Sequence, residues 1–319
     1  MKSTNNLTTH LVLLGAILRR WPRSMRKLDW WWERMYRAIG AGGFEADPAV
    51  DAHWPSGLQH PVSGRLHPFK VRLNVNDWLE RRAYFSGQLY QRDIEKLITL
   101  LIRPDDYFID VGANIGLVSL LAASRLGKSG CLVAIEPNPT VFKRLTGHLR
   151  DNGLLPTVTL LNIALGERSA TAFLHVAEGH TGTGTLTHGD AGIPVKVETA
   201  GEVIPAPADD QPVVIKMDVE GFECRALAGM SELLARVEVA VLTEISRDML
   251  ERIGDSSAAL HDKLVNAGFD CYLIHFSADR WHENFFLQHT LVVLDEPQYD
   301  ALYVKHGSKL ERRVSEFMR

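Results

Sequence analysis

The sequence predicts a doubly wound α/β domain with a mostly parallel, seven-stranded sheet that has one antiparallel strand, preceded by an α-helical N-terminal extension. Two observations carry this prediction. From residue 107 onward, short apolar runs alternate with segments of helical periodicity, an order that needs parallel strands joined by right-handed crossovers. The connection between the last two expected strands, 276–289, has no long helical pattern, which favours antiparallel pairing.

Residues 1–68 form the first expected region, and residues 69–319 form the second. Residues 1–40 are basic and contain four of the seven tryptophans. This composition suits a helix lying on an anionic membrane surface, and it equally suits a helical arm docked on its own domain or on a second subunit. Residues 41–68 are rich in glycine and proline, which predicts an irregular linker.

The elements of the second region follow in order. Alternation over 69–75 predicts a half-buried strand, and the spacing over 87–101 predicts a helix. The expected strands of the sheet are 107–111, 131–135, 158–163, 213–217, 237–242, 271–275 and 290–294. The expected helices are 115–126, 139–152, 224–234 and 257–267. Residues 170–176 and 193–199 have the pattern of an inserted antiparallel pair.

The bulk composition excludes several classes of protein. A net charge of −4 gives no general affinity for nucleic acid. Three widely spaced cysteines predict neither a disulfide framework nor a thiolate zinc site, so a reducing, cytoplasmic setting fits. The apolar run from Leu7 to Leu18 is too short to cross a bilayer. Arginines follow that run directly, without the small-residue pattern of a signal cleavage site.

The segment 110–116 reads D-x-G-x-N-x-G at a strand-to-helix junction, where open α/β sheets bind ligands. Gly112 and Gly116 allow close approach to the main chain. Glu136 follows the next strand, where a carboxylate can bind two ribose hydroxyls. The spacing does not fit a pyrophosphate, and Asp110 suits the ammonium and sulfonium groups of S-adenosylmethionine. The alternative is that Asp110 merely caps a turn.

Four segments, in this order, resemble the motifs of FkbM-type methyltransferases. They are 110–116, 136–139, 215–223 and 243–245. The resemblance runs from about residue 105 to 245 and implies a class I, Rossmann-like methyltransferase fold with S-adenosylmethionine as cofactor. It implies methyl transfer, commonly to a hydroxyl of a sugar, glycolipid or secondary metabolite, and some relatives resemble N-methyltransferases that act on peptides or amines.

The resemblance also assigns residues to parts of the cofactor. Those that would line its methionine side are Asp110, Gly112, Asn114 and Gly116. Glu136 would bind the ribose, whereas Asn138 and the turn from Asn162 to Ala164 would lie by the adenine. The sequence departs from the family at 199–202, where Thr-Ala-Gly-Glu replaces the usual Thr-Leu-Asp, and this departure concerns the support of the acceptor pocket.

Carboxylates gather at two neighbouring strand ends. Asp218 and Glu244 occupy corresponding positions and are the leading catalytic pair, with Glu220 next. Crowded carboxylates raise one another's proton affinity, which suits a general base, and their oxygens also suit a divalent cation. The alternative is a salt-bridged loop neutralised by Lys216 or Arg225.

Three histidines are also considered. His180 and His188 flank a glycine- and threonine-rich segment that would close over an acceptor as a lid, although exposed loop histidines are commoner. His275 lies between apolar residues and reads as a hydrogen-bonded core residue.

Two rival functions stay open at this point. One is a nicotinamide-dependent oxidoreductase, and the other is a non-catalytic cofactor-binding module recruited by its N-terminal arm to a membrane or an assembly partner. The main interpretation predicts a small-molecule, glycan or peptide acceptor and no nucleic acid. Peripheral membrane contact through residues 1–40 and homo-oligomer formation are the further partnerships that it allows.

Overall fold

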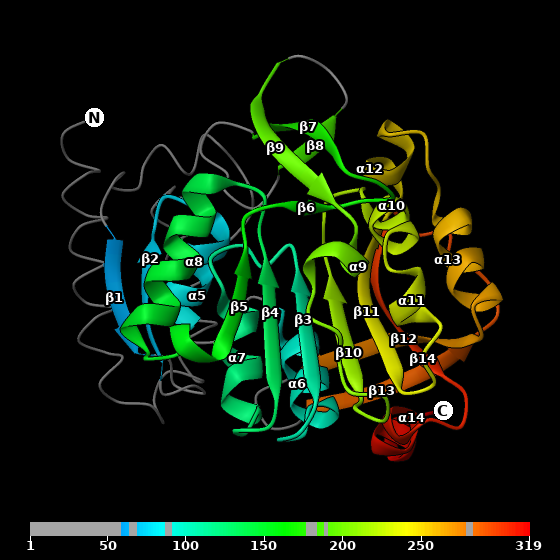
Figure 1. Ribbon diagram of the computed structural model, residues 1–319. Coiled ribbons are helices and arrows are strands. Elements are labelled where there is room, and N and C mark those ends of the chain that lie inside the picture. Colours follow the sequence, from blue (N-terminus) through cyan, green and yellow to red (C-terminus); the bar gives the residue numbers. More distant parts are fainter. Residues whose placement is uncertain (1–58, 64–68, 87–90, 177–183, 188–190, 279–282) are drawn as a thin grey trace, which may run out of the picture. The chain divides into compact units, whose positions relative to one another are not determined.

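The computed structural model describes residues 59–63, 69–86, 91–176, 184–187, 191–278 and 283–319 (Figure 1). The chain divides into two compact units. The first contains the described residues up to Arg92, and the second contains, among the described residues, 93–176, 184–277 and 283–319. The extension expected at residues 1–40 lies outside the described residues, so the boundary at residue 68 stays a prediction.

In the first unit, β1 (Gln59–Ser63) and β2 (Lys70–Asn74) form an antiparallel two-stranded sheet, and α5 (Trp78–Ser86) follows. Val71 and Leu73 are buried while their neighbours are more exposed, which confirms the predicted half-buried strand. Strand β1 corrects the expectation of an irregular linker throughout 41–68. Pro61 is compatible with β1 because both strands of a two-stranded sheet are edges, where an amide can go unpaired.

The second unit contains an eight-stranded sheet with the order β13-β12-β14-β11-β10-β3-β4-β5. Its parallel strands are β5 (Val158–Leu161), β4 (Cys131–Ile135), β3 (Tyr107–Val111), β10 (Val213–Met217) and β11 (Val239–Ser246). The antiparallel strand is β14 (Gln298–Lys305), which lies between β11 and β12 (Phe269–Ala278). The doubly wound, mostly parallel fold class is confirmed, but the number of seven strands is wrong because β13 (Glu283–Thr290) adds an eighth.

Helices connect the strands and bury their apolar sides against the sheet. They are α6 (Arg92–Leu101), α7 (Leu117–Arg125), α8 (Pro139–Asp151), α9 (Ala200–Val203), α10 (Glu223–Ala228), α11 (Ser231–Leu234), α12 (Arg247–Arg252) and α13 (Ser257–Asn266). In α6, for example, Ile94, Leu97, Ile98 and Leu101 are buried at helical spacing. Every residue of β3 and β10 is buried, as expected for central strands covered on both faces.

The predicted helix 224–234 is two short helices, α10 and α11, separated at Gly229. A Cβ atom at Gly229 would lie 1.9 Å from the carbonyl oxygen of Gly166. The chain passes so close to its neighbour here that only glycine fits. This long-range contact, which no local pattern reveals, requires glycine between the two helices.

The predicted strand 290–294 is wrong. Strand β13 ends at Thr290, and Leu291 and Val292 are exposed. The amide of Val292 donates to Oγ1 of Thr290 at 3.2 Å, which closes a bend. The reversed strand begins only at Gln298, so the apolar run that suggested a strand is an exposed connection.

A second sheet has four strands in the order β6-β9-β7-β8. They are β6 (Ala164–Leu165), β9 (Ile193–Glu198), β7 (Ala170–His175) and β8 (Thr185–Thr187). The antiparallel pairing of β7 and β9 confirms the predicted inserted pair. Its buried side chains pack on Phe222, in the turn after β10, so this sheet lies against one of the expected catalytic segments.

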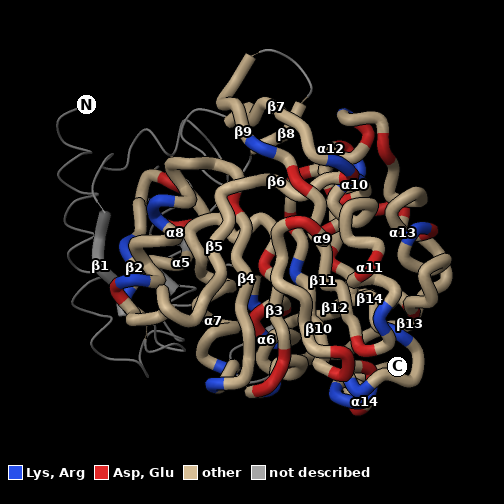
Figure 2. The backbone as a smooth tube through the Cα atoms, in the orientation of Figure 1, with Lys and Arg blue, Asp and Glu red and all other residues tan. Residues whose placement is uncertain are grey.

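The C-terminal helix α14 (Lys309–Val314) contains three basic residues, and Figure 2 shows the backbone of this helix partly in the blue of lysine and arginine. Arg313 forms a two-pronged ion pair with Asp106, which precedes β3 and is 1% exposed. This pair fixes the helix to the start of the central strand. No helix in the described part of the chain is long and apolar enough to cross a bilayer.

Candidate active site

The loop between β3 and α7 has a backbone that few residue types adopt. Gly112, Asn114 and Gly116 have φ angles of 75°, 49° and 89°, the left-handed region that glycine adopts without strain and asparagine tolerates. The amides of Gly112 and Ala113 both donate to the carbonyl of Ile135. The predicted cofactor loop is therefore held between the ends of β3 and β4.

Gly112 also packs against the turn that follows β10. A Cβ atom at Gly112 would lie 1.9 Å from the carbonyl oxygen of Asp218. The amide of Asp218 donates to the carbonyl of Val111 at 3.1 Å. The expected cofactor loop and the expected catalytic turn are thus in direct contact at one edge of the sheet.

Asp110, near the end of β3, is 0% exposed. Its Oδ2 accepts a hydrogen bond from the Ser119 hydroxyl at 2.6 Å, and its Oδ1 lies 3.7 Å from Nζ of Lys216. Burial raises the pKa of Asp110, while Lys216 and Ser119 oppose that rise. Its Oδ1 has no hydrogen-bond partner in the described part of the chain. Asp110 lies beneath the loop, where it can act on a ligand through the two groups that it contacts, Ser119 and Lys216.

Glu136 lies at the end of β4 with both carboxylate oxygens engaged. Oε2 accepts from the amide of Asn114 at 2.9 Å, and Oε1 accepts from the amide of Asn138 at 2.8 Å. Burial raises the pKa of Glu136 to about 7, although both hydrogen bonds oppose the rise. Each carboxylate oxygen has a second lone pair, so Glu136 can still accept hydrogen bonds from a ligand.

Asn138 and Asn162 shape the turn that carries Glu136. The Asn138 side chain caps α8 by accepting from the amides at its start. The Asn162 side chain donates to the carbonyls of Glu136 and Pro137 at 2.7 and 3.1 Å. Ala164 is buried in β6, next along the chain. All eight residues predicted to bind the cofactor therefore lie on β3, on β6 or in the segments that follow β3, β4 and β5.

The structure brings the predicted catalytic pair to adjacent positions. In the parallel pairing of β10 and β11, Met217 lies opposite Thr243, so Asp218 and Glu244 continue the same register. Side chains at one level of a sheet share a face. Glu220 follows in a tight turn with a φ angle of 52°. The predicted carboxylates are thus neighbours on one edge of the sheet.

Lys216 is the cation that faces these carboxylates. Its Nζ lies 3.4 Å from Oδ2 of Asp218. Burial lowers the pKa of Lys216, but the charges of Asp218 and Asp110 raise it above its ordinary value. The salt bridge considered as an alternative is therefore present for Asp218, whereas Arg225 pairs with Asp255 at 3.7 Å.

Three glutamates around Asp218 hold their protons unusually strongly. Burial raises the pKa of Glu220 to about 8, with added effects from the charges of Asp218 and Glu244. Burial likewise raises the pKa of Glu244 and of Glu223 to about 7. A carboxyl group that titrates near neutral pH can take up a proton during a reaction and release it afterwards. This arrangement can serve as a general base.

The sequence reasoning missed two residues on β14. Asp300 lies directly opposite Glu244 in the antiparallel pairing of β11 and β14. The Gln298 amide lowers the pKa of Glu244 against the effect of burial. Both follow the apolar run at 290–294, which suggested the last strand. Polar and apolar residues alternate only over 298–301, a weaker signal than the apolar run.

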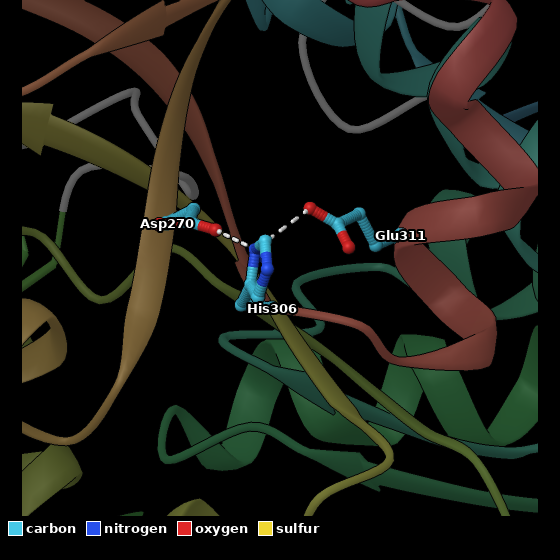
Figure 3. A group of neighbouring side chains, drawn as sticks. All are labelled: Asp270, His306 and Glu311. Atoms are coloured by element: carbon cyan, nitrogen blue, oxygen red, sulfur yellow. Dashed lines mark hydrogen bonds and ion pairs between the residues drawn. The ribbon is translucent and has the colours of Figure 1, made fainter.

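Three side chains of types that bind metal ions, Asp270, His306 and Glu311, lie close together elsewhere in the molecule. His306 Nδ1 lies 3.0 Å from Asp270 Oδ2 and 3.6 Å from Glu311 Oε1 (Figure 3). In the described part of the chain it is the one set of three such side chains whose ligand atoms converge within 4.8 Å. It lies at the start of β12 and the end of β14, the opposite edge from Asp218. Glu311 also accepts the Gly307 amide, as a helix-capping residue does.

The histidines predicted as a lid, His180 and His188, lie outside the described residues. His275 is in β12, where its ring stacks on Phe286 at 4.5 Å and bonds to Gln288 at 2.8 Å. The hydrogen bond predicted for His275 is present, between strands β12 and β13, but the prediction of a core residue is wrong, because the side chain is only partly buried at the edge of the sheet.

The segment 199–202, which departs from the family pattern, forms the start of α9. It is separate from the carboxylates Asp218, Glu220 and Glu244. Its residues Thr199, Ala200 and Gly201 line a cavity of about 320 Å³. Gly229, Glu232 and Arg236 are on the other walls. Glu202 accepts a hydrogen bond from Ser169 at 2.9 Å. The predicted catalytic residues do not line this cavity.

Comparisons with known proteins fit this geometry. A family model described as the methyltransferase FkbM domain matches residues 110–271. The hexuronic acid methyltransferase AglP of Haloferax volcanii is 28% identical over 187 residues, which cover 58% of this chain and 74% of that protein. The AMB antimetabolite synthetase AmbE of Pseudomonas aeruginosa is 32% identical over 162 residues, 49% of this chain and 7% of that protein.

Among solved structures, a methyltransferase FkbM from Methylobacillus flagellatus KT is similar, with a TM-score of 0.42 and 17% identity. The matched part covers 71% of this chain and 52% of that one. The chain thus spans about half the length of this structural relative.

Proposed function

The chain belongs to the FkbM methyltransferase family and is a methyltransferase with a class I, Rossmann-like fold, and we propose that it O-methylates a sugar-type acceptor with S-adenosylmethionine as cofactor. The acceptor would be a hydroxyl of a sugar, a glycolipid or a secondary metabolite. The observation that carries the proposal is the direct contact between the glycine loop after β3 and the carboxylate turn after β10. A relative whose name specifies hexuronic acid supports a sugar as the acceptor class.

The residues of the loop fit the proposed cofactor. The left-handed backbone at Gly112 and Gly116 leaves the loop without side chains at the points of closest approach. Glu136 can bind ribose hydroxyls, with Asn114 and Asn138 holding its carboxylate in place. Asp110 carries an oxygen without a hydrogen-bond partner beneath the loop, 3.7 Å from Nζ of Lys216, and its negative charge suits a ligand with positively charged groups. When bound, S-adenosylmethionine supplies an electrophilic methyl group on a sulfonium sulfur.

The carboxylates Asp218 and Glu244 would supply the proton transfer and the orientation of the acceptor. A hydroxyl that attacks a methyl carbon must lose its proton, while the departing sulfur keeps the electron pair of the broken bond. Glu244 would take that proton, and its pKa of about 7, close to neutral pH, supports this role. Asp218, partly exposed beside Lys216, would accept a hydrogen bond from the acceptor and orient it.

Binding and turnover test the two halves of the site separately. We expect S-adenosylhomocysteine to bind in isothermal titration and the reduced nicotinamide cofactors not to bind. Asp110→Ala and Glu136→Ala should lower that affinity. Asp218→Asn should preserve it while removing methyl transfer to the true acceptor, with Glu251→Gln, at an exposed residue of α12, as the control. Preference for a nicotinamide, or full turnover by Asp218→Asn, would contradict the proposal.

The acceptor is identified by labelled methyl transfer across a panel of glycans, glycolipids and peptides. Label in an ether-linked methyl group of a sugar is the expected result. Label only on peptide or amine nitrogen would replace O-methylation by N-methylation. Absence of transfer to every acceptor, with cofactor binding intact, would favour a non-catalytic binding module.

We also propose a cytoplasmic location with peripheral membrane contact through residues 1–40. The tryptophans and arginines of that segment support this proposal, because such residues suit an anionic lipid boundary. Sedimentation of the full chain with anionic liposomes, compared with a variant in which Trp30, Trp31 and Trp32 are alanine, tests it. Equal sedimentation of both would favour a docked arm or a subunit contact instead.

A further inference from the structure

Strand β14, which runs antiparallel to β11 and β12, adds a third carboxyl group, that of Asp300, beside those of Asp218 and Glu244. The pairing of β11 and β14 sets Asp300 directly opposite Glu244. The pairing of β10 and β11 brings Asp218 to the same level on the other side of Glu244. Residues at one level of adjacent strands lie on the same face, with their Cβ atoms about 5 Å apart. Three carboxyl groups therefore stand in a row across β10, β11 and β14.

Strand β14 also carries a second polar side chain near Glu244. Gln298 precedes Asp300 by two residues, so it points to the same face. Its amide lowers the pKa of Glu244. Glu244 therefore has an amide and a carboxyl group of β14 as neighbours.

We propose that Asp300 is a positioning residue of the methyltransferase, an uncharged acid whose hydroxyl hydrogen-bonds to the Glu244 carboxylate and holds it as the proton acceptor. The inference rests on the proposed function of Glu244 as the general base. In this arrangement Glu244 takes the proton of the acceptor hydroxyl, and Asp300 keeps its own proton throughout. Asp300 acts through Glu244 and does not itself touch the acceptor.

The charges around Asp300 support this assignment. Acidic groups face it from three elements, which are Asp93 on α6, Glu244 on β11 and Asp218 after β10. Lys216 is the basic group among those acting on Asp300, and it is already paired with Asp110 and Asp218.

Burial raises the pKa of Asp300 well above its ordinary value, and the three acidic neighbours raise it further against the opposing effect of Lys216. Two carboxyl groups directly opposite each other avoid repulsion by keeping one proton between them.

Infrared difference spectra of protein carrying labelled aspartate test the protonation without any need for an acceptor. We expect a protonated carboxyl band at pH 7 that is lost in Asp300→Asn. Glu296→Gln, at an exposed residue before β14, is the matched control and should keep the band. A spectrum in which Asp300→Asn removes no protonated carboxyl would overturn the proposal.

Turnover tests the positioning role. Asn has the shape of a neutral aspartic acid and can donate an N–H, so Asp300→Asn should keep kcat within about threefold. Asp300→Ala removes the donor, so kcat should fall about tenfold or more. The acid limb of the kcat/KM profile should then move to higher pH, because the Glu244 carboxylate has lost a stabilising hydrogen bond. Unchanged affinity for S-adenosylhomocysteine would show that both variants are folded.

The failure of this inference differs from a failure of the proposed function. If Glu244→Gln keeps full turnover, Glu244 is not the base, and the proposed mechanism is wrong. If Glu244→Gln abolishes turnover while Asp300→Ala matches the unaltered protein in kcat and pH profile, only the role of Asp300 is wrong. Equal loss in Asp300→Asn and Asp300→Ala would also overturn it, since an ionisable group would then be required.

Discussion

At the scale of single residues, the site depends on a few positions where backbone and charge permit little change. Gly112 lies where the loop after β3 meets the turn after β10, and any side chain there would displace Asp218. Lys216 lies between Asp110 and Asp218 and offsets part of their charge. Glu136 is held by two amides yet titrates near neutral pH. Each of these features has a measurable consequence.

Gly112→Ala should destabilise the protein by at least about 2 kcal/mol, because alanine is strained at a φ angle of 75° and its Cβ would overlap the Asp218 carbonyl. Gly147→Ala is the matched control. Gly147 lies within α8, and no atom lies within 4 Å of the position that a Cβ would take there, so alanine should stabilise by about 0.5–1 kcal/mol. Chemical denaturation measures both, and similar effects of the two changes would contradict this account.

Affinity for S-adenosylhomocysteine should weaken as the pH falls below about 7. Glu136 has a pKa of about 7, and only its ionised form accepts two ribose hydroxyl bonds with full strength. The loss approaches tenfold per pH unit once the protonated form dominates. Isothermal titration between pH 5.5 and 8 measures this dependence. Glu136→Gln should bind more weakly at pH 8 and show a flatter profile, and a profile as steep as that of the unaltered protein would assign the titration to another group.

At the scale of elements, the ends of β3 and β14 connect the site to the rest of the fold. β3 begins after Asp106, to which Arg313 of α14 is bound, and it ends in the cofactor loop. β14 begins with Gln298 and Asp300 beside Glu244, and it ends near the Asp270, His306 and Glu311 group. Strand β14 therefore adds Asp300 to the row of carboxyl groups formed with Asp218 and Glu244, and helix α14 anchors the central strand β3.

Arg313→Ala should destabilise the protein by about 3 kcal/mol, because it leaves the Asp106 carboxylate buried without its partner. Arg312→Ala, at the neighbouring exposed position of α14, should change stability by no more than about 0.5 kcal/mol. Urea unfolding followed by circular dichroism distinguishes them. Equal effects would mean that the ion pair with Asp106 contributes nothing beyond an ordinary surface contact.

Particular elements show how far the sequence predicts the fold. Strands 107–111, 131–135 and 213–217 match β3, β4 and β10 because each is a short apolar run bounded by turn residues and buried on both faces. The predicted helix is interrupted at Gly229, which packs against the distant Gly166 carbonyl, and the strand ends at Thr290, which bonds to the Val292 amide; local periodicity encodes neither contact. Asp300 was missed for the same reason, since its role arises from pairing with Glu244 across strands far apart in sequence.

At the scale of the whole molecule, the raised pKa values predict that stability falls as the pH rises from about 5 to 8. For Glu136, Glu220, Glu223 and Glu244 the folded pKa is about 7 or 8, against a reference value of 4.5. The folded state therefore binds more protons than the unfolded state between those values. Their contribution is fully present below about pH 4.5 and is lost as the pH rises through 7 and 8. Each proton of difference changes the unfolding free energy by about 1.4 kcal/mol per pH unit.

Thermal or urea unfolding across this range measures that slope. Glu220→Gln removes one of the four groups, so its stability should fall less steeply between pH 6 and 8 than that of the unaltered protein. Glu251→Gln, at an exposed position, should leave the slope unchanged. Stability that rises over this range would contradict the assignment of raised pKa values to these carboxyl groups.

The position of β14 also constrains how the chain acquires its structure during synthesis. β14 lies between β11 and β12, although both are made before it. Until residue 305 has left the ribosome, those two strands present open backbone edges that can pair with other chains. The sheet can close only by admitting its last strand into the interior, a non-local step that is intrinsically slow. The row of Asp218, Glu244 and Asp300 is therefore completed only when β14 enters the sheet. Until then, a nascent chain is exposed to association with other chains.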